Sequence, residues 1–377
     1  MTIFAYGFRT FFFLSGLAAV TLVLGWLRVL LGSGSTFAYI DPVGWHAHEM
    51  LFGYVSAMIA GFLLTAVPNW TGEKAHRGRT LALLAALWMT ARFLLLFSNS
   101  RMSGIVDLAF LPALVTLLVP SLLRAKQPKT LVFVPILILL WISNLLTHLQ
   151  TWRIADTRSD GLSLGIGLIV LLIALIGGRV IPFFTRVALK TEPRKSVWLE
   201  GLAIATVVLL PVLEIGQAST GLVVAWSVAA VVVHGLRLWG WLDRRVWRVP
   251  LLWVLHVGYA WLVLGLALKG MGALGLVPSA SAVHAFTGGA MGVVGLGIMS
   301  RASLGHTGRP LEPSTATVYS FVAINLAAFI RVFGPLTSLD ARLVYGLSGG
   351  FWCFAFLLFL WVYSPILFSP RADGKPG

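Results

Sequence analysis

The sequence is poor in cysteine and in charge. A single cysteine, Cys353, stands among 377 residues, which excludes a disulfide framework within one chain and every cysteine-based metal cluster. Histidine, methionine and carboxylate are then the ligands left for a metal. Only 11% of the residues are charged, 58% are hydrophobic and the mean hydropathy is +0.90. Water-soluble domains do not have this composition, so we expect an integral membrane protein.

Apolar runs long enough to cross a bilayer, about 20 residues each, follow one another along the whole chain. We therefore expect an all-α integral membrane protein with a single polytopic transmembrane domain over 1–368 and a short cytoplasmic tail over 369–377. The runs predict twelve transmembrane helices, at 9–31, 48–67, 79–98, 105–123, 130–150, 162–186, 197–216, 219–241, 250–270, 279–300, 314–334 and 342–366.

Basic residues alternate from loop to loop. The formal net charge of +15 comes from lysines and arginines scattered through short loops such as "GEKAHRGR" and "DRRVWR", whereas loops such as "EIGQAST" have none. Loops rich in Lys and Arg stay on the cytoplasmic side, so both termini are expected there. The positive charge is thus a topology signal, and no nucleic-acid partner is expected.

Four of the eight histidines fall at the predicted outer ends of their helices: His46, His48, His148 and His284. Each alone can be an interfacial side chain that reaches lipid headgroups. Four at one depth favour a metal or haem site, because imidazole is the usual protein ligand of haem iron and copper. We take these four as the candidate ligands.

The spacing of His46 and His48 leaves two geometries open. Positions i and i+2 of a helix are separated by about 200°, so two histidines inside one helix face opposite sides and serve different centres. If the helix begins at His48 instead, His46 lies in the loop and can share one centre with it. Glu49 either holds a ligating imidazole or complements the dipole of the helix start.

Three arginines are candidates for anionic partners. Arg92 and Arg331 lie deeper than the other outer arginines and can pair with haem propionates, although arginines also extend to headgroups. Arg179, in "LIGGRVIPFFT", stands between a glycine pair and a proline, where we expect a break in the helix and a buried charge with an anionic partner.

The inner half holds the remaining candidates. His256 lies within the ninth predicted helix, and His306 lies in "MSRASLGHTGRPL" between Arg301 and Arg309, a segment that also reads as a basic cytoplasmic loop. His234 is expected near the surface, before "RLWGW".

Several of these segments resemble the NnrS family of bacterial membrane proteins. The similar stretches are "GFRTFFFLSG", "WHAHEMLFGYVSAMIAGFLLTAVPNWTG", "GGRVIPFFT" and "MSRASLGHTGRPL", in this order along nearly the whole chain. The resemblance implies an inner-membrane protein that carries haem and copper and belongs to the response to nitric oxide and nitrosative stress, often beside denitrification genes. The family motifs fall on a few residues here: His46, His48, Glu49, Arg179, His284, Arg301, His306 and Arg309.

Three functions compete. The first is a membrane oxidoreductase with copper and b-type haem that binds or reduces nitric oxide, which partitions into lipid, with electrons from a donor such as quinol. The second is a twelve-helix transporter, against which stand the missing major-facilitator loop signature and the lack of a half-to-half repeat. The third is a haem-binding sensor or assembly factor without catalysis, which would share the ligands of the first.

Overall fold

Twelve helices in the described part of the chain are long and apolar enough to cross a membrane, as expected. The computed structural model describes residues 2–32, 37, 39–125 and 128–375; parts of two expected loops, 33–36, 38 and 126–127, and the last two residues of the expected tail, 376–377, lie outside the described residues. The twelve spans are Gly7–Leu30, Pro42–Thr71, Arg79–Phe97, Arg101–Arg124, Phe133–Thr151, Arg158–Leu189, Val197–Ile215, Thr220–Trp241, Pro250–Ala273, Ser279–His306, Thr315–Leu336 and Ala341–Phe368.

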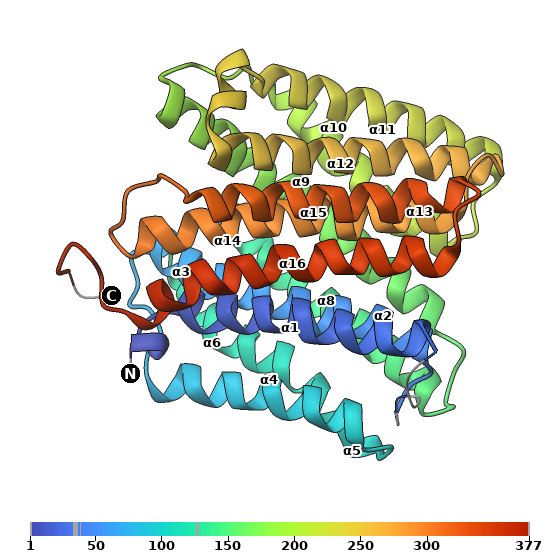
Figure 1. Cartoon of the computed structure of the whole chain (residues 1–377), viewed down its shortest axis with the longest axis horizontal. Coiled ribbons are helices and arrows are strands. Elements are labelled where there is room, and N and C mark those ends of the chain that lie inside the picture. The colour runs from blue at the N-terminus through green and yellow to red at the C-terminus, as the bar shows by residue number, and fades with distance from the viewer. Residues whose placement is uncertain (1, 33–36, 38, 126–127, 376–377) are drawn as a thin grey trace. The chain divides into compact units, whose positions relative to one another are not determined.

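Most of these spans are single α-helices, and four are divided. Figure 1 labels the helices. The chain also contains short 3₁₀ turns at Thr2–Phe4, Arg244–Arg248 and Gly334–Leu336, and π-helical turns at Glu49–Val55 and Ala285–Met291. The α-helices are α1 (Gly7–Leu30), α2 (Pro42–His48), α3 (Ser56–Thr71), α4 (Arg79–Phe97), α5 (Arg101–Leu108), α6 (Phe110–Arg124), α7 (Pro128–Leu131), α8 (Phe133–Thr151), α9 (Arg158–Leu189), α10 (Val197–Ile215), α11 (Thr220–Trp241), α12 (Pro250–Ala273), α13 (Ser279–His284), α14 (Gly292–His306), α15 (Thr315–Phe333) and α16 (Ala341–Phe368).

The chain forms two compact units. Unit 1 consists of residues 1–165, 302–311 and 356–377, and unit 2 of residues 166–301 and 312–355. Unit 1 therefore contains the first five spans, and unit 2 contains α10 to α13, α15 and most of α9 and α14. Each unit is described by itself below.

In unit 1 the first helix packs closely on the second span. A Cβ added at Gly61 would lie 2.7 Å from the Phe12 ring, so the glycine allows α1 and α3 to approach each other. The buried Arg9 donates to the carbonyl oxygens of Leu367 (2.8 Å) and Ser369 (2.7 Å). The start of α1 and the end of α16 thus lie at the same end of unit 1 (Figure 1).

The second span is built from three segments that position its histidines. Asp41 caps α2 by accepting a hydrogen bond from the Gly44 N–H (2.9 Å), and Pro42 occupies the first helical position, where its missing N–H is not needed. The helix continues from His48 into a π-helical turn over Glu49–Val55 before α3 begins. Such turns inside α-helices are frequent at functional sites.

In unit 2 the expected break at Arg179 is wrong. α9 is one continuous helix from Arg158 to Leu189 and the Arg179 side chain is exposed. The glycine pair before Arg179 makes room for side chains of other helices. A Cβ at Gly177 would meet the Tyr259 ring at 3.2 Å, and one at Gly178 would collide with the Arg237 guanidinium. The buried arginine of this region is therefore Arg237, on α11, rather than Arg179.

Candidate metal centre

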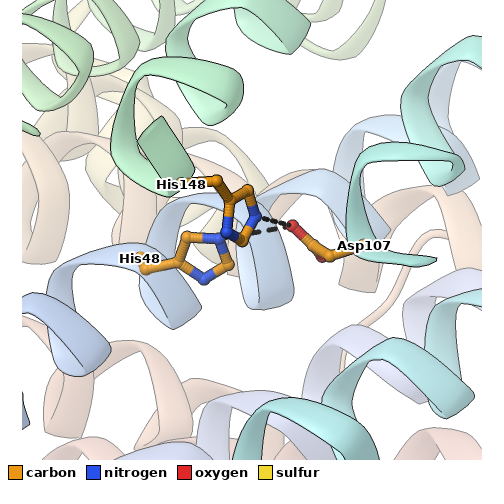
Figure 2. A group of neighbouring side chains, drawn as sticks. All are labelled: His48, Asp107 and His148. Carbon is orange, nitrogen blue, oxygen red and sulfur yellow. Dashed lines mark hydrogen bonds and ion pairs between the residues drawn. The ribbon is translucent and has the colours of Figure 1, made fainter. Parts of the chain in front are cut away.

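Two histidines and one carboxylate converge in the interior of unit 1. His48 ends α2, His148 lies in the last turn of α8 and Asp107 lies near the end of α5. Figure 2 shows both imidazoles directed at Asp107, whose Oδ2 is 3.0 Å from His148 Nε2 and 3.3 Å from His48 Nε2. One donor atom from each residue lies within 4.8 Å of the other two, a separation that one metal ion can bridge.

All three side chains are buried, with exposed fractions of 1% for His48, 2% for Asp107 and 0% for His148. The three residues lie on separate helices of unit 1, α2, α5 and α8. Placing three polar groups at one buried point is costly unless they bind one another or a shared ion.

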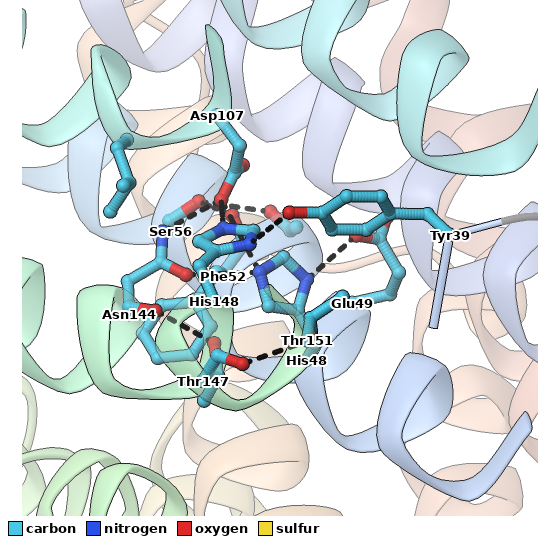
Figure 3. Close-up of polar contacts among 12 residues, drawn as sticks. Tyr39, His48, Glu49, Phe52, Ser56, Asp107, Asn144, Thr147, His148 and Thr151 are labelled. Atoms are coloured by element: carbon cyan, nitrogen blue, oxygen red, sulfur yellow. Dashed lines mark hydrogen bonds and ion pairs between the residues drawn. The ribbon is translucent and has the colours of Figure 1, made fainter. Parts of the chain in front are cut away.

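The second nitrogen of each imidazole is held by a protein group (Figure 3). His48 Nδ1 lies 3.0 Å from Glu49 Oε1, and His148 Nδ1 lies 3.0 Å from the Tyr39 hydroxyl. Burial raises the pKa of the Tyr39 phenol to about 12, so this hydroxyl keeps its proton at neutral pH. Partners of this kind fix the ring orientation and tautomer of metal-binding histidines. Of the two roles expected for Glu49, the structure places it in the first, against an imidazole.

The Asn144 side chain links Asp107 to His48. It lies one turn before His148 on α8; its Nδ2 donates to Asp107 Oδ2 (2.7 Å) and its Oδ1 lies 2.9 Å from His48 Nε2. Asn144 is 2% exposed. The side chain therefore fixes the distance between the carboxylate and the His48 ring.

Arg92 crosses the cluster and pairs with both of its carboxylates. Its Nη1 donates to Glu49 Oε1 at 2.8 Å, and its Nη2 forms an ion pair with Asp107. Gly53, in the π-helical turn, makes room for it, since a Cβ there would lie 3.1 Å from the guanidinium. Arg92 thus has protein carboxylates as partners, which differs from the haem propionates expected from the sequence.

Gly104, on α5, also lies close to the cluster, on the side of His148 and Tyr39. A Cβ at Gly104 would lie 2.8 Å from His148 Nδ1 and 2.8 Å from the Trp152 ring, and would collide with the Tyr39 hydroxyl. The Trp152 ring stacks on His148 with centroids 5.7 Å apart. Only a residue without a side chain fits between α5 and this group.

His46 takes no part in this donor group. It lies inside α2 together with His48, so the first of the two expected geometries holds, and it faces the other way. Its ring stacks on Trp26 with centroids 4.7 Å apart and an interplanar angle of 16°.

Unit 2 places His284 in a setting like that of His48. His284 ends α13 and is followed by the second π-helical turn, Ala285–Met291. Its Nδ1–H donates to the Ala280 carbonyl (2.8 Å), which leaves the Nε2 lone pair available. A Cβ added at Gly288, four residues on, would meet nothing within 4 Å. Arg331 lies near enough to interact electrostatically with His284, and its guanidinium stands 4.7 Å above the Tyr345 ring.

The remaining predicted residues do not gather with these groups in the contacts of the described residues. In unit 2, His256 is buried and donates through Nδ1 to the Leu252 carbonyl (3.0 Å), and the Arg301 guanidinium stands 3.8 Å above the Phe184 ring. In unit 1, the His306 ring lies 5.5 Å from the Phe8 ring and Arg309 contacts the Thr307 carbonyl at 3.5 Å.

The expectation of a near-surface His234 is wrong. His234 is fully buried, with Nδ1 2.7 Å from the Tyr259 hydroxyl and Nε2 3.2 Å from both Thr206 Oγ1 and the Ala203 carbonyl. The Tyr259 hydroxyl also accepts from Arg237 (2.7 Å), which pairs with Glu200. The aromatic and basic residues after His234 mark the end of α11. They led to the prediction of a surface position, although the His234 side chain faces the interior.

Sequence reasoning missed Asp107, Asn144 and Tyr39. Two signals were present in the sequence. Asp107 is an acidic residue inside an apolar run, which alone suggests function, and Asn144 lies four residues before His148, on the same helical face. Tyr39 gave no signal, because it lies in a loop whose path the sequence does not specify.

Fold and cluster together define a polytopic helical membrane protein with a buried histidine and carboxylate group able to bind a metal ion. A protein-family model described as NnrS protein matches residues 2–371 of this chain, which therefore belongs to the NnrS family. A comparison with curated proteins finds no match.

Proposed function

We propose that this protein binds copper at His48, Asp107 and His148 and uses it to bind or reduce nitric oxide in the bacterial inner membrane, as protection against nitrosative stress. One observation carries the proposal: two imidazole Nε2 atoms converge on one carboxylate oxygen inside a buried cluster. Membership of the NnrS family supports the assignment of the reaction class.

The charges of the cluster favour a bound cation. Glu49 and Asp107 contribute two negative charges and Arg92 one positive charge, so the group has a net charge of −1 when both imidazoles are neutral. An uncompensated buried charge costs several kcal/mol. A proton on one imidazole or a metal cation restores neutrality, and the two compete for the same nitrogen atoms.

The donor set suits copper. Imidazole nitrogen is a good ligand for copper, zinc and iron, and copper binds most tightly of the divalent first-row metals at a given nitrogen and oxygen site. A bound copper ion would supply one-electron chemistry and an open position for a small ligand. The protein's own contribution is to hold His48 through Glu49, to hold His148 through Tyr39 and to balance charge through Arg92.

Haem is assigned to unit 2 in this proposal, where the His284 imidazole would hold its iron. The support is its free Nε2 lone pair, the open space beside Gly288 and the nearby Arg331 for a propionate. Nitric oxide is small and uncharged, so it can enter from lipid, and quinol is the proposed electron donor.

The test combines metal analysis of the purified protein with reduced-minus-oxidised visible spectra in the presence and absence of nitric oxide. The proposal expects copper and b-type haem, a spectrum that shifts with nitric oxide, and loss of copper in His48→Ala but not in His234→Ala. Consumption of nitric oxide with a quinol analogue would distinguish turnover from binding. A protein free of metal and colour from a haem- and copper-supplied host would contradict the proposal.

A further inference from the structure

A pocket in unit 2 has no part in the functions proposed above. It is a cavity of about 240 Å³ between the adjoining ends of four helices, where α10 and α12 end and α11 and α13 begin. Its walls come from all four helices and the turn after α10: Leu210, Leu213, Glu214, Gln217, Ala218, Val223, Trp226, Leu268, Lys269, Gly272, Ala273, Ser279 and Ala282.

One ion pair lies in this otherwise mainly apolar wall. Lys269 Nζ binds Glu214 Oε1, and the two side chains keep 26% and 20% of their exposure. The Trp226 ring lines the cavity while its Nε1–H donates to the Thr206 carbonyl (2.9 Å), so the indole offers the pocket an apolar face. The cavity therefore presents one positive and one negative group side by side against an apolar floor.

Large apolar side chains are exposed on α10 and α11 of the pocket and in the turn between α12 and α13. Val212 is 58% exposed, Leu222 53% and Leu276 65%. In a membrane-spanning protein such side chains contact lipid acyl chains. A lipid can therefore reach this pocket from the bilayer, with its apolar part along these residues.

We propose that the pocket binds the headgroup of a zwitterionic phospholipid with a primary ammonium group, of the phosphatidylethanolamine class. Glu214 accepts hydrogen bonds from the ammonium group, Lys269 donates to the phosphate, and the acyl chains lie along Val212 and Leu222. The charges of the two side chains match those of such a headgroup one for one.

Charge balance selects this headgroup over others. Without lipid, Glu214 and Lys269 neutralise each other; a zwitterion replaces their one ion pair with two and brings no net charge into the pocket. An anionic headgroup would meet the Glu214 carboxylate, and a quaternary ammonium cannot donate a hydrogen bond to it. Hydrogen bonds to charged groups are worth more than about 1.5 kcal/mol, which corresponds to roughly tenfold in affinity.

The test measures lipid binding to the full-length protein by native mass spectrometry in detergent, with dioleoyl phosphatidylethanolamine, phosphatidylcholine and phosphatidylglycerol as probes. We expect phosphatidylethanolamine to bind about tenfold more tightly than the other two. Glu214→Gln should remove the preference over phosphatidylcholine, and Lys269→Met should weaken all three lipids. Glu312→Gln, which changes an exposed carboxylate outside the pocket, is the control and should retain the wild-type order.

Equal binding of the three lipids to the wild-type protein would overturn the proposal, and this result needs no variant. Tightest binding of phosphatidylglycerol would assign the pocket to anionic lipid instead. A wild-type preference that persists in Glu214→Gln would place the headgroup elsewhere, and displacement of the lipid by a short-chain quinol analogue at lower concentration would make the pocket a ring-binding site.

Discussion

Two buried polar clusters of this protein are built from the same residue types and differ in charge. In unit 1, Arg92 stands between Glu49 and Asp107 and leaves one negative charge uncompensated. In unit 2, Arg237 forms an ion pair with Glu200, and the two charges sum to zero. The first cluster therefore reaches neutrality only with an added proton or a metal cation, whereas the charges of the second already balance.

The histidines of the two clusters differ in the same way. His48 and His148 both direct Nε2 at a carboxylate that a metal can share, while both nitrogens of His234 meet neutral groups, the Tyr259 hydroxyl, Thr206 Oγ1 and the Ala203 carbonyl. Burial of a histidine is thus a poor sign of a metal site. Convergence of two imidazoles and an unbalanced charge are better ones.

The variants Arg92→Met and Arg237→Met should both lose stability, but copper should restore stability only in Arg92→Met. Arg92→Met leaves two buried carboxylates, with exposed fractions of 0% and 2%, and should destabilise the metal-free protein by about 3–5 kcal/mol. Copper should restore much of this loss. Arg237→Met should cost less, because Glu200 is 34% exposed and partly solvated, and copper should not restore it. Thermal unfolding in detergent with and without copper measures the stability of both variants. If copper stabilised the two variants equally, the proposed difference in charge between the clusters would be contradicted.

Loss of either converging histidine should lower copper affinity more than about 100-fold, since even the partners that orient a ligand are worth 10–100-fold. His48→Ala and His148→Ala test this by titration with a competing chelator. His234→Ala is the matched control, because it removes an equally buried imidazole and should change stability but not copper affinity. Retention of wild-type affinity in His148→Ala would exclude His148 as a ligand.

Gly104→Ala should lower copper affinity by about 10–100-fold with the ligands unchanged. The added methyl group meets His148 Nδ1 and the Tyr39 hydroxyl and must displace one of them. Gly201→Ala is a suitable control, because nothing lies within 4 Å of its Cβ position. An unchanged affinity in Gly104→Ala, measured by the same chelator competition, would show that the ring position does not matter.

Tyr39→Phe should have the smallest effect, about tenfold in copper affinity, because it removes only the hydroxyl that holds His148 Nδ1. The pKa of Tyr39 is raised to about 12, so its phenol is neutral in the folded protein and this hydroxyl donates or accepts unchanged between pH of about 7 and about 10. The ratio of wild-type to Tyr39→Phe affinity should therefore stay constant over this range. A ratio that rises towards pH 10 would show an ionising phenol, because a phenolate would hold His148 Nδ1–H more strongly and add negative charge beside the metal.

The sequence predicts the spans well because lipid leaves the backbone few alternatives to the helix, so that apolar length alone locates each helix. It also predicts His46, His48, His148 and His284 as a group, since they share a depth at helix ends; of these, His48 and His148 converge with Asp107, whereas His46 and His284 do not belong to that donor group. It does not predict their partners. The inward position of Asp107 on α5 and the loop position of Tyr39 depend on tertiary packing.

The arginine predictions show the same limit. Arg179 and Arg237 both lie in apolar helices near glycines or aromatics, and only packing decides that Arg237 is buried beside Gly178 while Arg179 is exposed. Helical position alone does not assign a face when little of the helix surface is polar.

The most direct test of the central claim is electron paramagnetic resonance of the metal-free protein after one equivalent of Cu²⁺. If His48, Asp107 and His148 bind the ion, the spectrum should show hyperfine coupling to two imidazole nitrogens, lose one coupling in each histidine variant and stay unchanged in His234→Ala. A spectrum of free copper in the wild-type protein, or one that survives both His48→Ala and His148→Ala, would contradict the account.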